Sequence, residues 1–345
     1  MEGTPWFAPF VYAGFVLVVL FALFGIFLVI HRRWRRLRQV AQDASAQRAT
    51  EAFTTAASQP HSPALLTVTR REFGAATLST GRFTLLEELG RGGMGVVWRA
   101  RDSVLGRQVA IKQLLPLSGG SPDVQETMRA RMLREARAAA QLAHRNAVTV
   151  HDVLLDQGSV LIVMELVKAV TLNKTVECEG PLPPARVAAI GLDMLDVLAE
   201  AHGLGIIHRD VKPANVLVQK DRSIKLADFG IARFEGDPTL TEAGAIIGTP
   251  AYMAPEQIRG LDSSPATDLW GLGVTLFYAV EGLSAFGRPS PTAAMAAVLT
   301  DPPLSPQRAR SPLGPLLMSL LTKDPSDRPT AAQLRSELSQ LTRSI

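Results

Sequence analysis

The sequence predicts an α+β fold preceded by a membrane-spanning helix, and three observations support this expectation. Residues 10–30 contain no charged side chain. A strand-like stretch over residues 83–89 then leads into a glycine-rich turn over residues 90–95, and the β-branched pair Val96-Val97 follows it, which is typical of a strand hairpin. Helical stretches dominate later, over roughly residues 125–142, residues 190–203 and the segment from residue 268 onward. A strand-rich part therefore precedes a helix-rich part.

The composition excludes several classes of protein. With 345 residues, 47% of them hydrophobic, the chain can bury a large core and is too apolar to be disordered throughout. Cys178 is the only cysteine, which excludes a disulfide scaffold and a multi-cysteine zinc module. The net charge of +4 arises within residues 1–81, because residues 82–345 hold 28 basic and 28 acidic residues. The basic surplus therefore gives no reason to expect a nucleic-acid partner.

Phe10–Ile30 is expected to cross a membrane once. A helix of 21 residues is about 31 Å long, close to the thickness of the hydrocarbon core. Five arginines follow within residues 32–38, whereas only Glu2 is charged before the span, which places the C-terminal side in the cytoplasm. Trp6 and Trp34 lie where interfacial aromatic residues are expected. A signal peptide would carry its positive charges before a shorter apolar run, and a core helix would have a polar face.

These features divide the chain into four parts. Residues 1–9 form a short tail outside the cytoplasm, residues 10–30 the transmembrane helix, residues 31–81 a basic juxtamembrane segment and flexible linker, and residues 82–342 a folded cytoplasmic domain. Because only about nine residues precede the span, signals are expected to arrive through partner membrane proteins or through dimerisation of this chain.

The glycine-rich turn Gly90–Gly95 lies between two apolar strands. In a dinucleotide-binding fold a helix would follow the last glycine, but Val96 and Val97 favour a second strand. Without side chains, the backbone N–H groups of such a loop can approach phosphate oxygens. The turn therefore predicts a hairpin that folds over a nucleotide.

Lys112 ends a third apolar strand, Val109–Lys112, and a buried ammonium group needs an anionic partner. The helix expected over residues 125–142 carries Glu135 near its middle. We expect an ion pair between Lys112 and Glu135 that holds the ammonium group against α- and β-phosphate oxygens. Taken alone, Glu135 fits a solvated helix residue equally well.

The strongest motif is Ile207-His-Arg-Asp-Val-Lys-Pro-Ala-Asn215, followed by Asp228-Phe-Gly230. Together with the glycine-rich turn, Lys112 and Glu135, in the same order and at similar spacing, these residues resemble eukaryotic-type (Hanks-type) protein kinases, in particular bacterial membrane-anchored members. The resemblance covers roughly residues 82–342. It implies a two-lobed protein kinase fold, with a small β-rich N-lobe and a larger α-helical C-lobe, and transfer of a phosphoryl group from ATP.

The resemblance implies a role for each motif residue. Asp210 would orient the substrate hydroxyl and accept its proton, and Lys212 would contact the γ-phosphate. Asn215 and Asp228 would hold Mg²⁺, or Mn²⁺ in its place, because both offer hard oxygen ligands. Lys112 and Glu135 would complete the catalytic set. The residues implied to bind ATP are Leu89, Gly90, Arg91, Gly92, Gly93, Met94, Gly95, Val97, Ala110, Lys112, Glu165 and Val167.

Further residues resemble serine/threonine kinases in particular. Lys212 is typical of that class, whereas tyrosine kinases usually carry a different loop. The segment Gly248–Glu256 is similar to the platform that binds the residue after the phosphoacceptor, and Thr249 in it would contact the catalytic aspartate. Two structural expectations follow from the same resemblance: Glu256 pairs with Arg328, and the helix carrying Asp268 anchors the catalytic loop.

Two features concern nucleotide affinity and regulation. Lys168-Ala169 stand where similar kinases often have Asp-Gly, which puts the ribose contacts in doubt. Arg209 precedes the catalytic aspartate, and kinases with this arginine are usually activated by phosphorylation of the activation loop. We expect a phosphate on Thr241, or in second place on Thr239, to pair with Arg209.

Two other functions stay open: a pseudokinase that acts as a membrane scaffold, and a small-molecule phosphotransferase of related fold. The intact motif residues argue against the first, and the platform segment argues against the second. The expected partners are proteins with Ser or Thr acceptors, the lipid bilayer and a second copy in a homodimer. The abundance of Ala, Arg and Leu is similar to that of bacterial members of the family.

Overall fold

The computed structural model describes residues 76–78, 81–92, 95–114, 122–230, 250–310 and 312–343. The expected transmembrane helix and most of the linker lie outside these residues. Within the described ranges, no helix combines the length and the apolar character that a membrane crossing requires.

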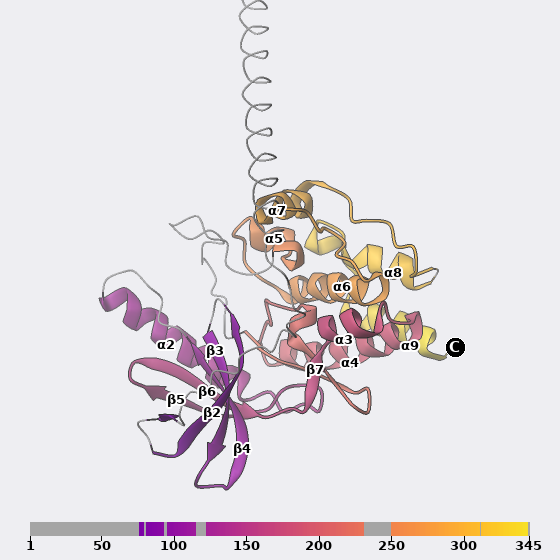
Figure 1. Ribbon diagram of the computed structural model, residues 1–345. Coiled ribbons are helices and arrows are strands. Elements are labelled where there is room, and N and C mark those ends of the chain that lie inside the picture. Colours follow the sequence, from indigo (N-terminus) through magenta and orange to yellow (C-terminus); the bar gives the residue numbers. More distant parts are fainter. Residues whose placement is uncertain are drawn as a thin grey trace, which may run out of the picture. The chain divides into compact units, whose positions relative to one another are not determined.

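Six strands form one antiparallel sheet in the order β1-β2-β3-β4-β6-β5 (Figure 1). The chain runs as a meander from β2 to β4, passes through helix α2, and returns as the hairpin β5–β6, with β6 paired to β4. This is the β-rich lobe that the sequence predicts. Its strands are β1 (Ala76–Thr77), β2 (Phe83–Gly92), β3 (Gly95–Asp102), β4 (Arg107–Leu114), β5 (Val150–Asp156) and β6 (Ser159–Glu165).

Alternate residues of β4 lie on opposite faces of this sheet, as the strand period requires. Val109 and Ile111 join a small buried cluster around Phe83 on one face. Ala110 joins the large core that continues into the helical lobe. Lys112 lies two residues further along and shares the face of Ala110. The strand thus turns its lysine toward the helical lobe.

Helix α2 (Pro122–Ala139) packs on the sheet beside β5 and β6 (Figure 1). It begins and ends three residues earlier than the predicted range of 125–142. Proline is well tolerated in a first helical turn, which explains a start at Pro122. Ala136 and Ala139 are its buried contacts with the core. Its apolar face therefore combines these two small residues with Met132 and Leu133, which are partly buried against the same core.

The second lobe is mostly helical, with α4 and α6 at its centre (Figure 1). Nearly every residue of α6 is buried, in keeping with its strongly apolar sequence. A short three-stranded sheet, β7-β8-β9, lies in the same lobe. The helices of this lobe are α3 (Leu172–Glu179), α4 (Pro184–Gly203), α5 (Pro255–Ile258), α6 (Pro265–Glu281), α7 (Pro291–Thr300), α8 (Leu313–Leu320) and α9 (Ala331–Arg343). The 3₁₀ turns are η1 (Pro213–Asn215), η2 (Pro250–Tyr252) and η3 (Pro325–Asp327). The strands of the small sheet are β7 (Ala169–Thr171), β8 (Val216–Gln219) and β9 (Ile224–Leu226).

The α+β expectation and its division into two lobes are confirmed for the described residues. The segment predicted as helical over residues 190–203 is the second part of α4, and Asp268 lies in the first turn of α6. The residues of the strongest motif lie between these two helices in the chain, around η1 and β8.

Candidate active site

The loop before η1 is held by the buried carboxylate of Asp268. Oδ2 of Asp268 accepts a hydrogen bond from the backbone N–H of His208 at 2.8 Å, and Oδ1 accepts one from the N–H of Arg209 at 2.8 Å. The ring of His202, from α4, lies 2.7 Å from Oδ2. The predicted anchoring of this loop by α6 is therefore confirmed.

Two of the other motif residues donate hydrogen bonds to Asp210. Lys212 donates to Oδ2 of Asp210 at 2.6 Å. The amide nitrogen of Asn215 donates to the backbone carbonyl of Asp210 at 2.8 Å and to Oδ2 at 3.2 Å. The turn η1 makes this possible, because it brings Asn215 back beside Asp210 after only five residues. One carboxylate oxygen thus has two donors, which orients the group.

Lys112 and Asp228 form the second pair of the site. The ammonium of Lys112, which is 5% exposed, lies 2.9 Å from Oδ1 of Asp228. Burial acts to raise the pKa of Asp228, but the ammonium of Lys112, with smaller contributions from His208 and Lys212, outweighs it and holds that pKa below its usual range. Asp228 is therefore ionised at neutral pH.

The two pairs belong to one site. The backbone N–H of Ala227 bonds to the carbonyl of Asn215 at 2.9 Å, and the ring of His208 lies 2.9 Å from the carbonyl of Ala227. The N–H of Gly230 bonds to the carbonyl of His208 at 3.3 Å. The segment that carries Asp228 thus runs alongside the loop that carries Asp210, and Lys212 also helps to lower the pKa of Asp228.

The expected ion pair between Lys112 and Glu135 was wrong. Glu135 instead lies 3.4 Å from the guanidinium of Arg209, and Lys112 takes the carboxylate of Asp228. The physical reason is the position of α2, which brings Glu135 to the catalytic loop rather than to β4. Residue types cannot fix this choice, because two cations and two carboxylates allow either pairing.

The glycine-rich turn joins β2 to β3 as a hairpin, as the sequence predicts, and Gly92 pairs with Gly95 at its end. A Cβ atom on Gly95 would overlap the backbone carbonyl of Gln113 in β4, so a side chain is excluded there. Val97 pairs with Lys112 across β3 and β4. Leu89, Gly90, Arg91 and Gly92 all belong to β2, while Gly93 and Met94 lie outside the described residues.

The segment after β6 connects the two lobes. Glu165 accepts hydrogen bonds from the backbone N–H of Thr149 at 2.8 Å and from Lys225 of β9 at 2.7 Å. Burial acts to raise the pKa of Glu165, but these donors more than offset it and lower the pKa overall. Its side chain therefore braces the connection between the lobes. Val167 follows it, and Ala169, part of the Lys168-Ala169 departure, begins β7.

Asn215 and Asp228 fit a divalent cation by their donor atoms. The Nδ2 atom of Asn215 is used by Asp210, which leaves its amide oxygen for a metal. Asp228 supplies an ionised carboxylate. Such hard oxygens suit Mg²⁺ when substrate phosphates complete the coordination shell. Among the described residues no group of three His, Cys, Asp or Glu side chains could hold a metal by itself.

The remaining predicted residues divide into two groups. Glu256 and Arg328 form the expected pair, with distances of 2.7 and 2.8 Å, and both are buried. Thr239, Thr241 and Thr249 lie outside the described residues.

Sequence reasoning missed two contacts of the catalytic loop. His202 touches Asp268, and Gln257 donates to the carbonyl of Arg209 at 2.8 Å. The only local signal for Gln257 was its position three residues after Ala254, at the start of a proline-initiated turn, where a glutamine can cap the backbone. Nothing in the motif pattern pointed to His202.

A family model described as the protein kinase domain matches residues 83–338. Serine/threonine-protein kinase PkaA of Streptomyces coelicolor is 35% identical over 267 residues, which are 73% of this chain and 48% of PkaA. Serine/threonine-protein kinase pkn3 of Myxococcus xanthus is 38% identical over 260 residues, 71% of this chain and 47% of pkn3.

A third relative, serine/threonine-protein kinase PknB of Mycolicibacterium smegmatis, is 38% identical over 268 residues, 74% of this chain and 42% of PknB. The chain thus spans less than half the length of these three relatives. Because the family model matches most of the chain, and the Asp210 and Lys112 pairs meet in one site, the chain belongs to the protein kinase family.

Proposed function

We propose that this chain is a membrane-anchored serine/threonine protein kinase, which transfers the γ-phosphoryl group of ATP to Ser and Thr hydroxyls of proteins, its own activation loop included. The observation that carries the proposal is the carboxylate of Asp210, held by Lys212 and Asn215 next to the Lys112–Asp228 pair. Phosphoryl transfer needs mainly positioning and neutralisation of charge, and these residues supply both.

Each side chain has a defined task in this proposal. Asp210 uses Oδ1 to orient the acceptor hydroxyl and to take its proton, because Oδ2 is occupied by Lys212 and Asn215. Lys212 lies beside that carboxylate and neutralises charge on the transferred group. Lys112 contributes a second cation next to Asp228. Mg²⁺, when bound, neutralises the phosphates further.

The membrane anchor is proposed for residues 10–30, with the catalytic domain on the cytoplasmic side of a bacterial membrane. The support is an uncharged stretch of 21 residues followed directly by an arginine-rich segment. The proposal is tested by membrane extraction: at alkaline pH the full chain stays in the bilayer, whereas a variant lacking residues 10–30 is released. Release of both would contradict it.

Regulation is proposed to act through Arg209. A phosphate on Thr241 or Thr239 adds about −1.5 to −2 charge and pairs strongly with a guanidinium. The test is the double variant Thr239→Ala/Thr241→Ala, which should phosphorylate a protein substrate more slowly than the wild type. An unchanged rate would contradict this part of the proposal alone. Dimerisation at the membrane would favour phosphorylation between two copies.

The central experiment is phosphopeptide mapping of the purified full chain after incubation with Mg-ATP. Phosphate is expected on Ser and Thr residues only, with Thr241 prominent. Asp210→Asn should lower the rate about 10²–10⁴-fold, because it removes the proposed base. The matched control is Asp221→Asn, which removes an exposed carboxylate from the turn between β8 and β9 and should leave the rate unchanged.

Two outcomes would overturn the assignment. Equal rates for the wild type and Asp210→Asn would indicate a pseudokinase. Transfer of phosphate to small hydroxyl compounds but to no protein would indicate a small-molecule phosphotransferase.

A further inference from the structure

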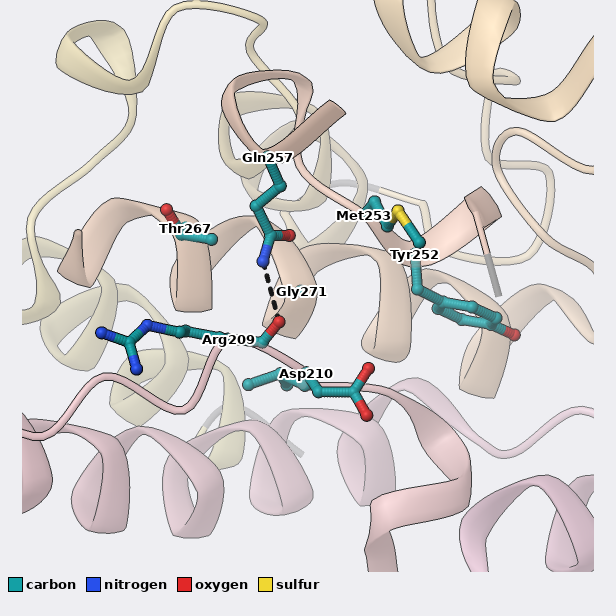
Figure 2. Close-up of a pocket in the computed structure, with 8 residues that line it drawn as sticks. Arg209, Asp210, Tyr252, Met253, Gln257, Thr267 and Gly271 are labelled. Atoms are coloured by element: carbon teal, nitrogen blue, oxygen red, sulfur yellow. Dashed lines mark hydrogen bonds between the residues drawn. The ribbon is translucent and has the colours of Figure 1, made fainter. Parts of the chain in front are cut away.

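The side chain of Gln257 connects two segments that meet at the active site. Its Nε2 donates to the backbone carbonyl of Arg209 at 2.8 Å, and its Oε1 accepts from the backbone N–H of Ala254 at 3.0 Å. Figure 2 shows the carboxamide pointing from α5 onto that carbonyl oxygen, with Asp210 next along the chain. The bonded carbonyl belongs to the peptide group that joins Arg209 to Asp210.

This peptide group needs support from its surroundings. Arg209 has φ of 64°, in the left-handed region that residues with a Cβ atom avoid. Such a conformation persists when neighbouring groups hold it in place. The N–H of Arg209 is held by Asp268 of α6, and its carbonyl is held by Gln257 of α5. Hydrogen bonds with two helices therefore fix both the N–H and the carbonyl of the residue before Asp210.

The other end of the carboxamide reaches the segment before α5. Ala254 follows η2 (Pro250–Tyr252), and Tyr252 and Met253 line a small pocket together with Asp210 and Gln257 (Figure 2). One side chain thus bonds both the loop that carries Asp210 and the segment expected to receive the acceptor peptide.

We propose that Gln257 is a positioning residue for phosphoryl transfer: it fixes the Arg209–Asp210 peptide group relative to the segment before α5, and so sets the orientation of the Asp210 carboxylate toward its acceptor. The proposal rests on the proposed kinase function and adds a residue to it. Gln257 touches neither Mg²⁺ ligands nor the Lys112–Asp228 pair among its described bonds. Its effect is therefore on turnover rather than on nucleotide binding.

A second glutamine, Gln333, caps the start of a helix in the same way as Gln257 and serves as the control. Gln333 accepts a hydrogen bond from the N–H of Thr330 at 2.8 Å, with the same spacing of three residues, at the start of α9. Within the described part of the chain its amide nitrogen makes no bond to the catalytic loop. Gln257→Glu and Gln333→Glu therefore both keep a capping oxygen, and only the first loses a donor to Arg209.

The test compares these two variants with the wild type in the full-length protein. Transfer from Mg-ATP to myelin basic protein gives kcat and KM, calorimetry gives the stoichiometry of Mg-ATP binding, and amide hydrogen exchange reports on residues 205–212. For Gln257→Glu we expect kcat to fall about tenfold or more, with an unchanged KM for Mg-ATP, full binding stoichiometry and faster exchange of that segment. Gln333→Glu should match the wild type in every measurement.

Each result decides the proposal. Unchanged exchange over residues 205–212 in Gln257→Glu would overturn it, whatever happens to kcat, because the effect would not pass through the loop. Faster exchange with an unchanged kcat would overturn the positioning role. If the wild type itself transfers no phosphate, the proposed function fails, and the exchange measurement still shows whether Gln257 holds the loop.

Discussion

The carboxylate of Glu135 pairs with the guanidinium of Arg209 across 3.4 Å, while the ammonium of Lys112 lies 2.9 Å from Asp228. Glu135 and Arg209 come from α2 and from the catalytic loop, so the contact joins the two lobes. The proposed phosphate on the activation loop would compete with Glu135 for the same guanidinium. A phosphate that pairs with Arg209 would therefore weaken this contact between α2 and the catalytic loop.

This competition predicts the behaviour of Arg209→Gln. In phosphatase-treated protein the variant should be more active than the wild type, because it lacks the ion pair that joins α2 to the catalytic loop. A partly buried pair worth about 1 kcal/mol corresponds to a change of about fivefold. Phosphorylation should then add no further activity. Transfer to myelin basic protein, before and after incubation with Mg-ATP, measures both effects.

The control for this prediction is Arg134→Gln, which removes an exposed arginine of α2 next to Glu135 and should change neither form of the protein. A dephosphorylated Arg209→Gln that is slower than the wild type would show that the Glu135–Arg209 pair supports activity rather than restrains it.

Gly271 predicts a second effect on the catalytic loop. It lies inside α6, where glycine is normally unfavourable by about 1 kcal/mol relative to alanine. A Cβ atom at this position would meet both Cβ and the carbonyl oxygen of Val211 at 2.8 Å. Gly271→Ala must therefore displace the residue that follows Asp210, and kcat should fall about tenfold or more.

The comparison for Gly271→Ala is Gly203→Ala at the end of α4, where a Cβ atom would meet nothing within 4 Å. We expect Gly203→Ala to retain wild-type kcat and a similar unfolding temperature. Wild-type turnover in Gly271→Ala would show that α6 does not control the position of the loop.

Local patterns were sufficient for most of the fold and for the motif residues. The hairpin around Gly90–Gly95 followed from the strand-like stretch before the turn and the β-branched pair Val96-Val97 after it, and the meeting of Asp210 with Lys212 and Asn215 followed from a short loop. The pairing of Glu135 could not be predicted, because it depends on where α2 lies against the second lobe. The role of Gln257 depends on a bond across 48 residues of sequence, which no local pattern encodes.

The buried pair of Glu256 and Arg328 predicts a large effect on stability. Burial acts to raise the pKa of Glu256, but the hydrogen bonds and charge of Arg328, assisted by a backbone N–H and by Thr267, outweigh it and keep the carboxylate ionised. Removing one partner leaves an uncompensated buried charge, which typically lowers the free energy of unfolding by about 3–5 kcal/mol. Arg328→Met should show this loss in urea unfolding.

The contrasting pair is Lys174 and Glu177, which is exposed on α3. Lys174→Met should leave the unfolding transition unchanged, since exposed pairs contribute little. Similar midpoints for Arg328→Met and Lys174→Met would mean that the Glu256–Arg328 pair does not stabilise the helical lobe.

Asp102 predicts the acid sensitivity of the β-rich lobe. Its hydrogen bonds from Arg82 are the largest influence on its carboxyl group; burial opposes them, and the N–H groups of Leu105 and Val104 assist, so that the pKa falls to about 2. The ordinary value is 3.8. A carboxylate with a lowered pKa stabilises the folded state fully above its unfolded pKa, and this contribution is lost as the pH falls toward the folded value.

Asp102→Asn keeps an oxygen for the turn but loses the ionic bonds to Arg82. Its deficit in the free energy of unfolding relative to the wild type should therefore be constant above about pH 5 and shrink below about pH 4, as measured by urea unfolding at a series of pH values. Asp301→Asn, which removes the carboxylate of a more exposed pair with Arg288, should show a smaller deficit. A deficit for Asp102→Asn that stays the same from pH 6 to pH 3 would exclude the ionised pair as its source, because only a charge that titrates in this range can make the difference depend on pH.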